Sequence, residues 1–524
     1  MQVPMTPIRI LKRAVKLYPE KTAVVDGEIR FTYKQVQARV NQVTNAIYNL
    51  GIPPGGRIAM LDFNTHRYME MYFGAAQSGR VLLPLNTQLS ADEYAYILDD
   101  AEAEAIIFHA DFKPLIDQVR ARTKTVKYFF IAEGEADIFW MSGPYENLLA
   151  AQSTQAHITE PDDENDMLNL YYTSGTTGRP KGVMLTHRNI YANALSTIIS
   201  FKLEDATVWH HIAPLFHLAD AFFIWSITFQ GGRHVMNRQF RPRAVLQKMQ
   251  DERVTCAMMV PTMINCLLDT PGIEQFDLSM LKFVMVGGAP MSPAKARRMI
   301  EKLGCQYISG YGMTETCPLL TVGNLKDTLN ALPIEDRLGH ITRTGLEVVG
   351  VDLRVVDKDG QDVPRDGKTV GEIIVRGDNV MKGYWKLPSE TAEAFRDGYF
   401  YTGDLANVDP EGYVFIVDRS KDIIIRSGEN IASVEIENFL YTHPQILECA
   451  VIAVPDKRWG EVPKALIVQK QGADLTEKEL IRYCRAGLAR FKVPKYITFL
   501  GALPKTGSGK IVKTQLRKLY ASEG

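Results

Sequence analysis

The chain has 524 residues, enough for more than one domain, and its 46% hydrophobic and 23% charged content is ordinary for a soluble globular protein. A formal net charge of −1 excludes the strongly basic surface by which proteins bind nucleic acid or an anionic membrane. The six cysteines include no CxxC pair, which favours reduced thiols over a disulfide framework or a zinc site.

Targeting signals are sparse as well. No stretch approaches the roughly 20 apolar residues of a membrane span, and the amphipathic segment 1–21 carries too many lysines and arginines for a signal peptide. The C-terminus does not carry the peroxisomal targeting signal SKL. We therefore expect a cytoplasmic protein with no transmembrane segment and no nucleic-acid partner, and a homodimer stays open.

The first part of the chain alternates short apolar runs with amphipathic stretches, which predicts strand–helix–strand units and a largely parallel sheet. Asp26–Gly27 marks a hairpin turn, Thr32 can cap a helix that ends at Gly51, and Ser90 with Glu93 forms a capping box. The expected strands are 24–25, 29–31, 57–63, 81–85, 105–109, 255–260, 283–286 and 305–309, with further helices at 67–77 and 293–303.

The texture changes after Gly339, where short strands with Gly and Asp turns predict a small β-barrel-like part. Beyond it, helices at 433–440 and 477–488 and strands at 448–454 and 465–470 predict a separate small α+β unit. The predicted fold class is α/β, with doubly wound sheets in a large N-terminal domain, residues 1–420, and a smaller C-terminal domain, residues 421–524.

The segment Tyr171–Asn189, YYTSGTTGRPKGVMLTHRN, is poor in packing residues and rich in groups that bind anions. Its glycines allow successive backbone N–H groups to converge on one anion, and Lys181 adds a charge suited to a polyphosphate oxygen. The spacing is not that of a Walker A loop, and Pro180 would interrupt the helix that such a loop opens. Strand-like flanks place the segment between two strands, where a solvated hairpin loop is the competing interpretation.

Other segments also combine glycine with polar side chains, namely VGGAP at 286–290, SGYGMTET at 309–316, FYTGDL at 400–405, DRSKD at 418–422 and PKTGSGKIVK at 504–513. The first two follow predicted strands, at the sheet edge where doubly wound folds bind ligands. Asp404 stands beside a turn glycine, where a carboxylate can accept two ribose hydroxyls. Singly, each segment has an ordinary alternative, such as a tight turn, an Asx-turn, a charged linker or a solvated tail.

Together these motifs resemble those of the acyl-CoA synthetase branch of the adenylate-forming enzymes, the superfamily of firefly luciferase and peptide-synthetase adenylation domains. YTSGTTGRPKG, GYGMTE, YTGDL, DRSKDIIIRSGENI and PKTGSGK occur in the family's order and spacing, from about Tyr18 to Leu519. The resemblance implies a mobile C-terminal domain and two half-reactions. A carboxylate attacks the α-phosphate of ATP to give acyl-AMP and pyrophosphate, and the thiol of coenzyme A then displaces AMP.

The resemblance also implies roles for individual residues. Lys510 is expected to bridge the attacking carboxylate and the α-phosphate, Thr314 to hydrogen-bond that phosphate, and Glu315 to ligate Mg²⁺. Tyr311 would stack on adenine and Asp404 would accept the ribose hydroxyls. The other expected ligands are Thr173, Ser174, Gly175, Thr176, Thr177, Gly178 and Lys181 for the β- and γ-phosphates, Gly288 and Ala289 beside adenine, Arg419 for ribose or phosphate, and Gly428 along the pantetheine tunnel.

Lys421 is the expected hinge, because one fixed arrangement cannot hold Lys510 at the α-phosphate and later admit the thiol. The face around Arg426, Glu429 and Asn430 would then turn toward the site. This prediction rests on the resemblance and on the steric conflict between the two half-reactions.

The acyl pocket is less clearly indicated. Acetate-activating relatives close it with a tryptophan at the position of Gly312, so glycine predicts room for a longer or ringed acyl group. His217 resembles the family residue at the pocket entrance, with a packed or capping histidine as the alternative. Phe216 and 286–287 are candidate walls, whereas the apolar run 221–229 is more typical of a core helix.

The sequence therefore predicts an ATP-dependent acid–CoA ligase, with His217, Thr314, Glu315 and Lys510 as catalytic residues. We expect a medium- or long-chain fatty acid, with an aromatic or alicyclic acid as the second choice. An acyl-AMP ligase that passes its product to a carrier protein, a luciferase-like oxidative enzyme and a non-catalytic nucleotide-binding regulator are the competing classes.

Overall fold

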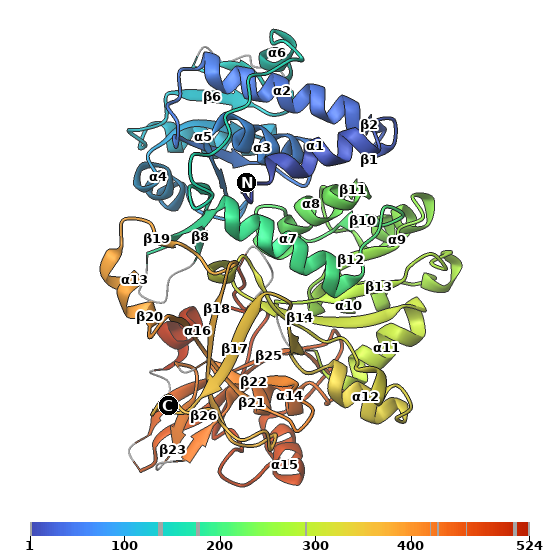
Figure 1. The fold of residues 1–524 in the computed structure, drawn as a ribbon. Coiled ribbons are helices and arrows are strands. Elements are labelled where there is room, and N and C mark those ends of the chain that lie inside the picture. Colours follow the sequence, from blue (N-terminus) through green and yellow to red (C-terminus); the bar gives the residue numbers. More distant parts are fainter. Residues whose placement is uncertain are drawn as a thin grey trace.

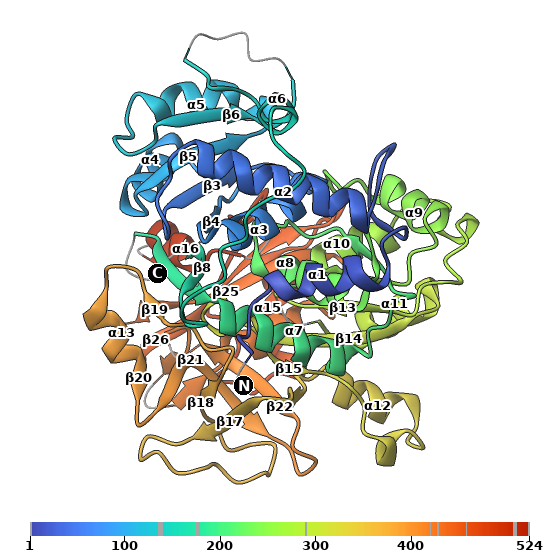
Figure 2. The same cartoon turned by 45° about the horizontal axis from the view of Figure 1, so that its top comes forward.

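The computed structural model describes residues 3–134, 140–173, 179–288, 291–419, 421–426, 429–456, 458–506 and 511–521. Within these ranges the strands form two large, mostly parallel sheets and a small antiparallel sheet in the N-terminal domain, and one mixed sheet in the smaller C-terminal domain (Figure 1 and Figure 2). No helix in this described part is long and apolar enough to cross a membrane. The predicted α/β fold class is confirmed.

Sixteen α-helices accompany the sheets in the described ranges: α1 Ile8–Leu17, α2 Tyr33–Asn49, α3 His66–Ser78, α4 Ala91–Asp100, α5 Lys113–Arg120, α6 Tyr145–Ala150, α7 His187–Phe201, α8 Leu218–Gln230, α9 Pro242–Asp251, α10 Pro261–Leu268, α11 Pro293–Leu303, α12 Ile334–Ile341, α13 Pro388–Ala394, α14 Ser433–Leu440, α15 Glu477–Gly487 and α16 Lys513–Tyr520. Thr32 caps α2 and Ser90 forms a capping box with Glu93 at α4, as predicted, and Thr32 also forms a capping box with Gln35.

The first large sheet has nine strands, parallel in its centre and antiparallel at both edges. In spatial order they are β16 Leu346–Glu347, β15 Leu319–Val322, β14 Gln306–Gly312, β13 Phe283–Val286, β12 Cys256–Met259, β10 Val208–His211, β11 Arg233–Met236, β1 Thr22–Asp26 and β2 Ile29–Thr32. The predicted hairpin joins β1 to β2, and Gly27 takes the positive φ of +60° that its turn requires.

The second large sheet has eight strands in the order β19 Gly383–Tyr384, β9 Lys181–Thr186, β8 Met167–Thr173, β4 Val81–Pro84, β3 Arg57–Leu61, β5 Ala103–Phe108, β6 Tyr128–Ile131 and β7 Gly143–Pro144. One apolar core joins it to the first sheet. Helix α3 is buried along its whole length, and α8 is buried almost throughout, as expected for helices that lie between two sheets. The apolar run 221–229 is therefore core helix, as predicted.

The small antiparallel sheet contains β17 Val351–Val356, β18 Gly371–Gly377, β21 Tyr399–Val408 and β20 Phe395–Arg396, with β22 Val414–Arg419 beside β21. It occupies the region for which the sequence predicts the small β part. The long strand β21 carries the FYTGDL motif, and β22 leads into the predicted domain boundary.

The C-terminal sheet consists of β24 Glu429–Ile431, β23 Ile424–Arg426, β26 Gly460–Gln469 and β25 Ile446–Asp456, with β27 Tyr496–Phe499 beside β26. This domain packs against the N-terminal domain near α11, where the ammonium of Lys295 lies 4.1 Å from the ring centre of Tyr441. Nearby on α10, Cys266 is the exposed cysteine, and the charges of Lys505 and Glu448 from the C-terminal domain act on it. The other five cysteines are buried.

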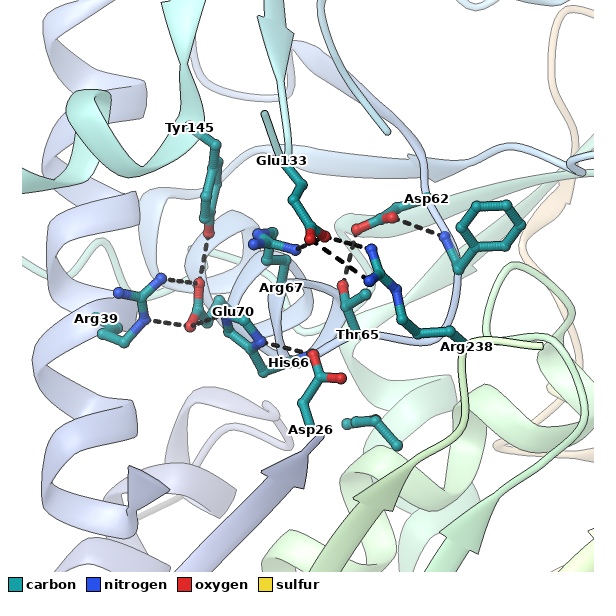
Figure 3. Close-up of polar contacts among 12 residues, drawn as sticks. Asp26, Arg39, Asp62, Thr65, His66, Arg67, Glu70, Glu133, Tyr145 and Arg238 are labelled. Carbon is teal, nitrogen blue, oxygen red and sulfur yellow. Dashed lines mark hydrogen bonds and ion pairs between the residues drawn. The ribbon is translucent and has the colours of Figure 1, made fainter. Parts of the chain in front are cut away.

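An ionic cluster connects β1 of the first sheet to the β3–α3 loop of the second (Figure 3). Asp26 Oδ2 lies 2.8 Å from Nδ1 of His66 and also accepts the His66 backbone N–H at 3.1 Å. Glu70 accepts from Arg39 of α2 and from the Tyr145 hydroxyl of α6. These contacts connect the first turns of α3 to β1, α2 and α6.

Candidate functional site

The hydroxyl-rich segment lies between the antiparallel strands β8 and β9, as its strand-like flanks predict. Thr173 and Lys181 face each other as the last antiparallel pair before the turn. Ser174, Gly175, Thr176, Thr177 and Gly178 lie outside the described residues. The ammonium of Lys181 stands 5.3 Å from the centre of the Tyr384 ring. Tyr384 is not among the sequence-predicted site residues.

Tyr384 links this hairpin to Glu315. Its strand pairs with β9 through Tyr384 and Val183, while its hydroxyl donates to Oε1 of Glu315 at 3.1 Å. Glu315 lies in the short 3₁₀ turn η3, Thr314–Thr316, directly after β14. Burial raises the pKa of the Glu315 carboxyl, and the hydrogen bond from Tyr384 partly offsets this effect. Tyr384 therefore contacts both the predicted metal ligand, Glu315, and the predicted phosphate-binding residue Lys181.

A second group joins Tyr311, Asp404 and Arg419. The Tyr311 hydroxyl donates to Oδ2 of Asp404 at 2.8 Å, and Arg419 Nε lies 3.1 Å from Oδ1 of the same carboxylate. Asp404 and Arg419 are direct neighbours across β21 and β22. Burial, together with the negative charge of Asp404, raises the pKa of Tyr311 well above its usual range. Tyr311 lies at the end of β14 and Glu315 in the 3₁₀ turn that follows, so the two groups adjoin.

Gly288 follows β13 with φ +80°, a conformation that glycine adopts without strain. Its neighbour Ala289 lies outside the described residues. Gly287, a predicted wall of the acyl pocket, is buried, and a methyl group there would meet the Gly310 carbonyl oxygen at 3.3 Å and Met258 Cε at 3.5 Å. This position has room for little more than a small side chain.

The expectation that Gly312 leaves room for a longer acyl group stays a prediction, but the structure gives a separate steric reason for glycine at this position. A Cβ atom at Gly312 would lie 1.6 Å from the carbonyl oxygen of Pro318, which accepts the backbone N–H of Met313 at 3.1 Å. Backbone thus fills the space that a side chain at position 312 would enter, and the sequence motif alone could not show this. The glycine is needed for the close approach of the two chain segments.

His217 is the N-cap residue of α8, and its Nδ1 accepts the backbone N–H of Ala219 at 3.2 Å. The capping role, which the sequence left as an alternative, is therefore present. Phe216 is buried directly before it. Both residues end the loop between β10 and α8.

The remaining predictions concern the C-terminal domain. Lys510 and Gly428 lie outside the described residues. Lys421 follows Arg419 closely, and the next residue, Asp422, pairs with Arg517 of α16. Because α16 starts soon after the position of Lys510, this ion pair connects the predicted hinge to the segment that carries the lysine. In the described residues no cluster of three or more His, Cys, Asp or Glu side chains could hold a metal ion.

Comparison with known proteins decides the family. The family model of the AMP-binding enzymes matches residues 11–385, and the model of the AMP-binding enzyme C-terminal domain matches residues 435–510. The chain belongs to the AMP-binding enzyme family. Lys181, Glu315 and Tyr384 lie in the first match and Lys510 ends the second, whereas Asp404, Arg419 and Lys421 lie between the two matches.

Relatives within this AMP-binding family match the chain over nearly its full length. A feruloyl-CoA synthase from Amycolatopsis sp is 37% identical and covers 97% of this chain and 98% of its own. A peroxisomal butyrate–CoA ligase from Arabidopsis thaliana is 36% identical, with 99% and 93% covered. The crystal structure of ATP-bound MatB from Rhodopseudomonas palustris superimposes with a TM-score of 0.88 at 30% identity, covering 99% and 100% of the two chains.

Proposed function

We propose that this protein is an AMP-forming acid–CoA ligase that activates a small carboxylic acid, aromatic or alicyclic in preference to a long fatty acid. The observation that carries the proposal is the connected group of Lys181, Tyr384 and Glu315 beside Tyr311 and Asp404. A site that binds a nucleoside triphosphate needs a cation for the phosphates, a carboxylate suited to Mg²⁺ and a second carboxylate beside an aromatic ring for the nucleoside.

The first half-reaction joins the acid to AMP. An oxygen of the substrate carboxylate attacks the α-phosphorus of ATP, and the bond to the β-phosphate breaks to release pyrophosphate. Lys181 and the β8–β9 hairpin would bind the leaving phosphates, and Thr314 would hydrogen-bond the α-phosphate. Glu315 would hold Mg²⁺, which neutralises phosphate charge. Few protein ligands are expected for this ion, since Mg²⁺ is usually held by one or two carboxylates plus phosphate oxygens.

Asp404 is the residue we assign to the ribose hydroxyls. The bond from Tyr311 and the ion pair with Arg419 fix both of its oxygens, so the carboxylate is oriented before the nucleotide binds. Gly288 and Ala289 would lie along the adenine, with Tyr311 stacked on it.

In the second half-reaction the thiol sulfur of coenzyme A attacks the acyl carbonyl carbon, and AMP leaves with the bonding electron pair. We propose the boundary 420/421 and the hinge Lys421 for the domain rotation between the two steps. The ion pair from Asp422 to Arg517 supports this position, because a rotation about Lys421 would move α16 and Lys510 as one unit. Gly428 would then line the passage for pantetheine.

The choice of acid rests on the relatives. Ferulate is an aromatic acid and butyrate a short one, and neither resembles a long-chain fatty acid. These observations favour the second sequence-based choice over the first.

The test mixes the purified protein with ATP, Mg²⁺ and one acid from a panel of ferulate, benzoate, cyclohexanecarboxylate, butyrate, octanoate and palmitate, with and without coenzyme A. We expect AMP release that depends on coenzyme A and is fastest with a ring-bearing acid. Palmitate as the best substrate would contradict the proposed substrate class. AMP or pyrophosphate release indifferent to coenzyme A would instead indicate transfer to another acceptor.

A further inference from the structure

The loop between β10 and α8 is bound by side chains of the β3–α3 loop and of α3. It runs through 212–217 and ends at Phe216 and His217, outside either strand ladder. Such a loop satisfies its backbone groups by other partners when it is buried. Its partners here are two residues of the β3–α3 unit, Asn64 and Tyr72.

Asn64 bonds three backbone groups at once. Its amide Nδ2 donates to the carbonyl of His211 at 3.0 Å and to that of Ala213 at 2.8 Å, while its Oδ1 accepts the N–H of Leu215 at 2.7 Å. Asn64 is only 4% exposed, so these bonds form in a site with little competing water. One side chain therefore sets the path of the loop over five residues.

Tyr72, fully buried in α3, binds the other side of Leu215. Its hydroxyl donates to the Leu215 carbonyl at 2.9 Å and lies 2.6 Å from the hydroxyl of Tyr171. Since the Tyr72 proton is used toward Leu215, Tyr171 is the donor in the second bond. Tyr171 lies in β8, two residues before Thr173, so one hydroxyl touches both the loop that leads to His217 and the strand that leads to the phosphate-binding hairpin.

The segment that presents Asn64 is itself rigidly held. The Asp62 carboxylate accepts the backbone N–H of Phe63 at 2.7 Å and the Thr65 hydroxyl at 2.8 Å (Figure 3). On its far side, His66 is fixed to Asp26 of β1. Asn64 thus lies between two fixed neighbours, so its own position is well defined and it can fix the position of the loop 212–217.

From these contacts we infer that Asn64 and Tyr72 are positioning residues, which hold the acyl side of the site, 212–217, in register with the phosphate side, β8. The inference rests on the proposed function, in which the acid enters beside Phe216 and His217. In-line attack needs the carboxylate and the α-phosphate in a fixed relation, and small displacements are costly to the rate. The β8 side has its own ladder to β9, whereas these two side chains bind the loop to the β3–α3 unit, beside the loop's own bond from the His217 N–H to the Pro214 carbonyl at 3.0 Å.

The test compares Tyr72→Phe with Tyr68→Phe. Both tyrosines are fully buried in α3, but the Tyr68 hydroxyl bonds the Met60 carbonyl at 3.5 Å and the Asp62 backbone, both of which belong to the β3–α3 unit itself. Tyr72→Phe removes the bond to Leu215 and the acceptor for Tyr171, and should raise the KM for the acid about threefold to tenfold, with the KM for ATP near that of the wild type. Tyr68→Phe should leave both constants unchanged.

Asn64→Asp provides the second variant, since it keeps the acceptor for Leu215 but places a carboxylate oxygen against two carbonyls. We expect a larger rise in the KM for the acid than in Tyr72→Phe. Wild-type enzyme that turns over no acid would defeat the proposed function itself. If the wild type is active and Tyr72→Phe shifts the KM for the acid and the KM for ATP equally, or shifts neither, the positioning role is wrong while the proposed function stands.

Discussion

The hydroxyl of Tyr311 donates a hydrogen bond to Oδ2 of Asp404 at 2.8 Å, although 93 residues separate them in the sequence. This bond joins the end of β14 in the first sheet to β21 in the small antiparallel sheet. It leaves Arg419 to balance the other oxygen of the same carboxylate. Two motifs that the sequence could relate only by family order are thus in direct contact.

Asp404→Asn should weaken nucleotide binding with little loss of stability. The amide can still accept from Tyr311, but it loses the negative charge that strengthens hydrogen bonds from ribose hydroxyls. We expect a Kd for AMP that is about tenfold to a hundredfold higher by calorimetry. Tyr311→Phe should weaken binding less, since it leaves the carboxylate and Arg419 intact. Unchanged AMP binding in Asp404→Asn would place the ribose elsewhere.

Glu315→Gln should lower the apparent affinity for Mg²⁺ in the adenylation assay by at least about tenfold, because a neutral amide oxygen is a poorer ligand for a hard cation. The glutamine keeps an acceptor for Tyr384, so the melting temperature should change little. Tyr384→Phe is the matched control, since it removes the hydrogen bond and leaves the charge. A loss of stability that accounts for the loss of activity would mark Glu315 as a structural carboxylate.

Two glycine variants separate a steric requirement from pocket volume. Gly312→Ala places a methyl group 1.6 Å from the Pro318 carbonyl oxygen, which the backbone cannot relieve without moving, so we expect a strongly lowered melting temperature. Gly287→Ala meets its nearest atom at 3.3 Å and should fold. It should reduce kcat/KM for ferulate more than for butyrate. Equal reductions with both acids would show that Gly287 does not line the acyl pocket.

The His66–Asp26 contact predicts a pH dependence of stability. Burial opposes protonation of His66, but the bond to Asp26 and the nearby Glu146 and Glu70 outweigh it and raise the pKa to about 9. A folded-state pKa above the unfolded value of about 6.5 stabilises the fold fully below that pH. The contribution, up to about 3 kcal/mol, is then lost as the pH rises through 9.

Thermal unfolding of His66→Gln and wild type between pH 6 and 10 measures this term. The stability difference between the two proteins should shrink as the pH rises. His157, an exposed histidine, supplies the control variant His157→Gln. A difference that stays constant over the whole range would mean that His66 is neutral in the folded protein.

Lys510→Ala and Lys421→Pro should separate the half-reactions. The first variant should lose acyl-AMP formation yet convert supplied acyl-AMP and coenzyme A to thioester. The second fixes φ at the proposed hinge and should form acyl-AMP but fail at thioester formation. Parallel loss of both steps in two folded variants would contradict a mechanism with two domain positions.

Local signals made much of the fold predictable. Capping boxes at Thr32 and Ser90, the turn at Gly27 and the hairpin around Lys181 depend on neighbours within a few residues, and the structure contains all of them. Tyr384, Asn64 and Tyr72 escaped the sequence analysis because their partners lie far away in the chain. The crowding at Gly312 was hidden for the same reason, since it comes from the backbone of Pro318 and only the folded path reveals it.

The burial of five cysteines gives the chain one accessible thiol, Cys266, close to charges of the C-terminal domain. A maleimide dye would therefore attach at a single place in the unmodified protein, on the N-terminal side of the contact between the domains. When the C-terminal domain rotates, the charges and surfaces around that dye change, and its emission changes with them. A dye on the native Cys266 thus allows the time course of domain rotation to be measured and compared with the release of pyrophosphate and AMP.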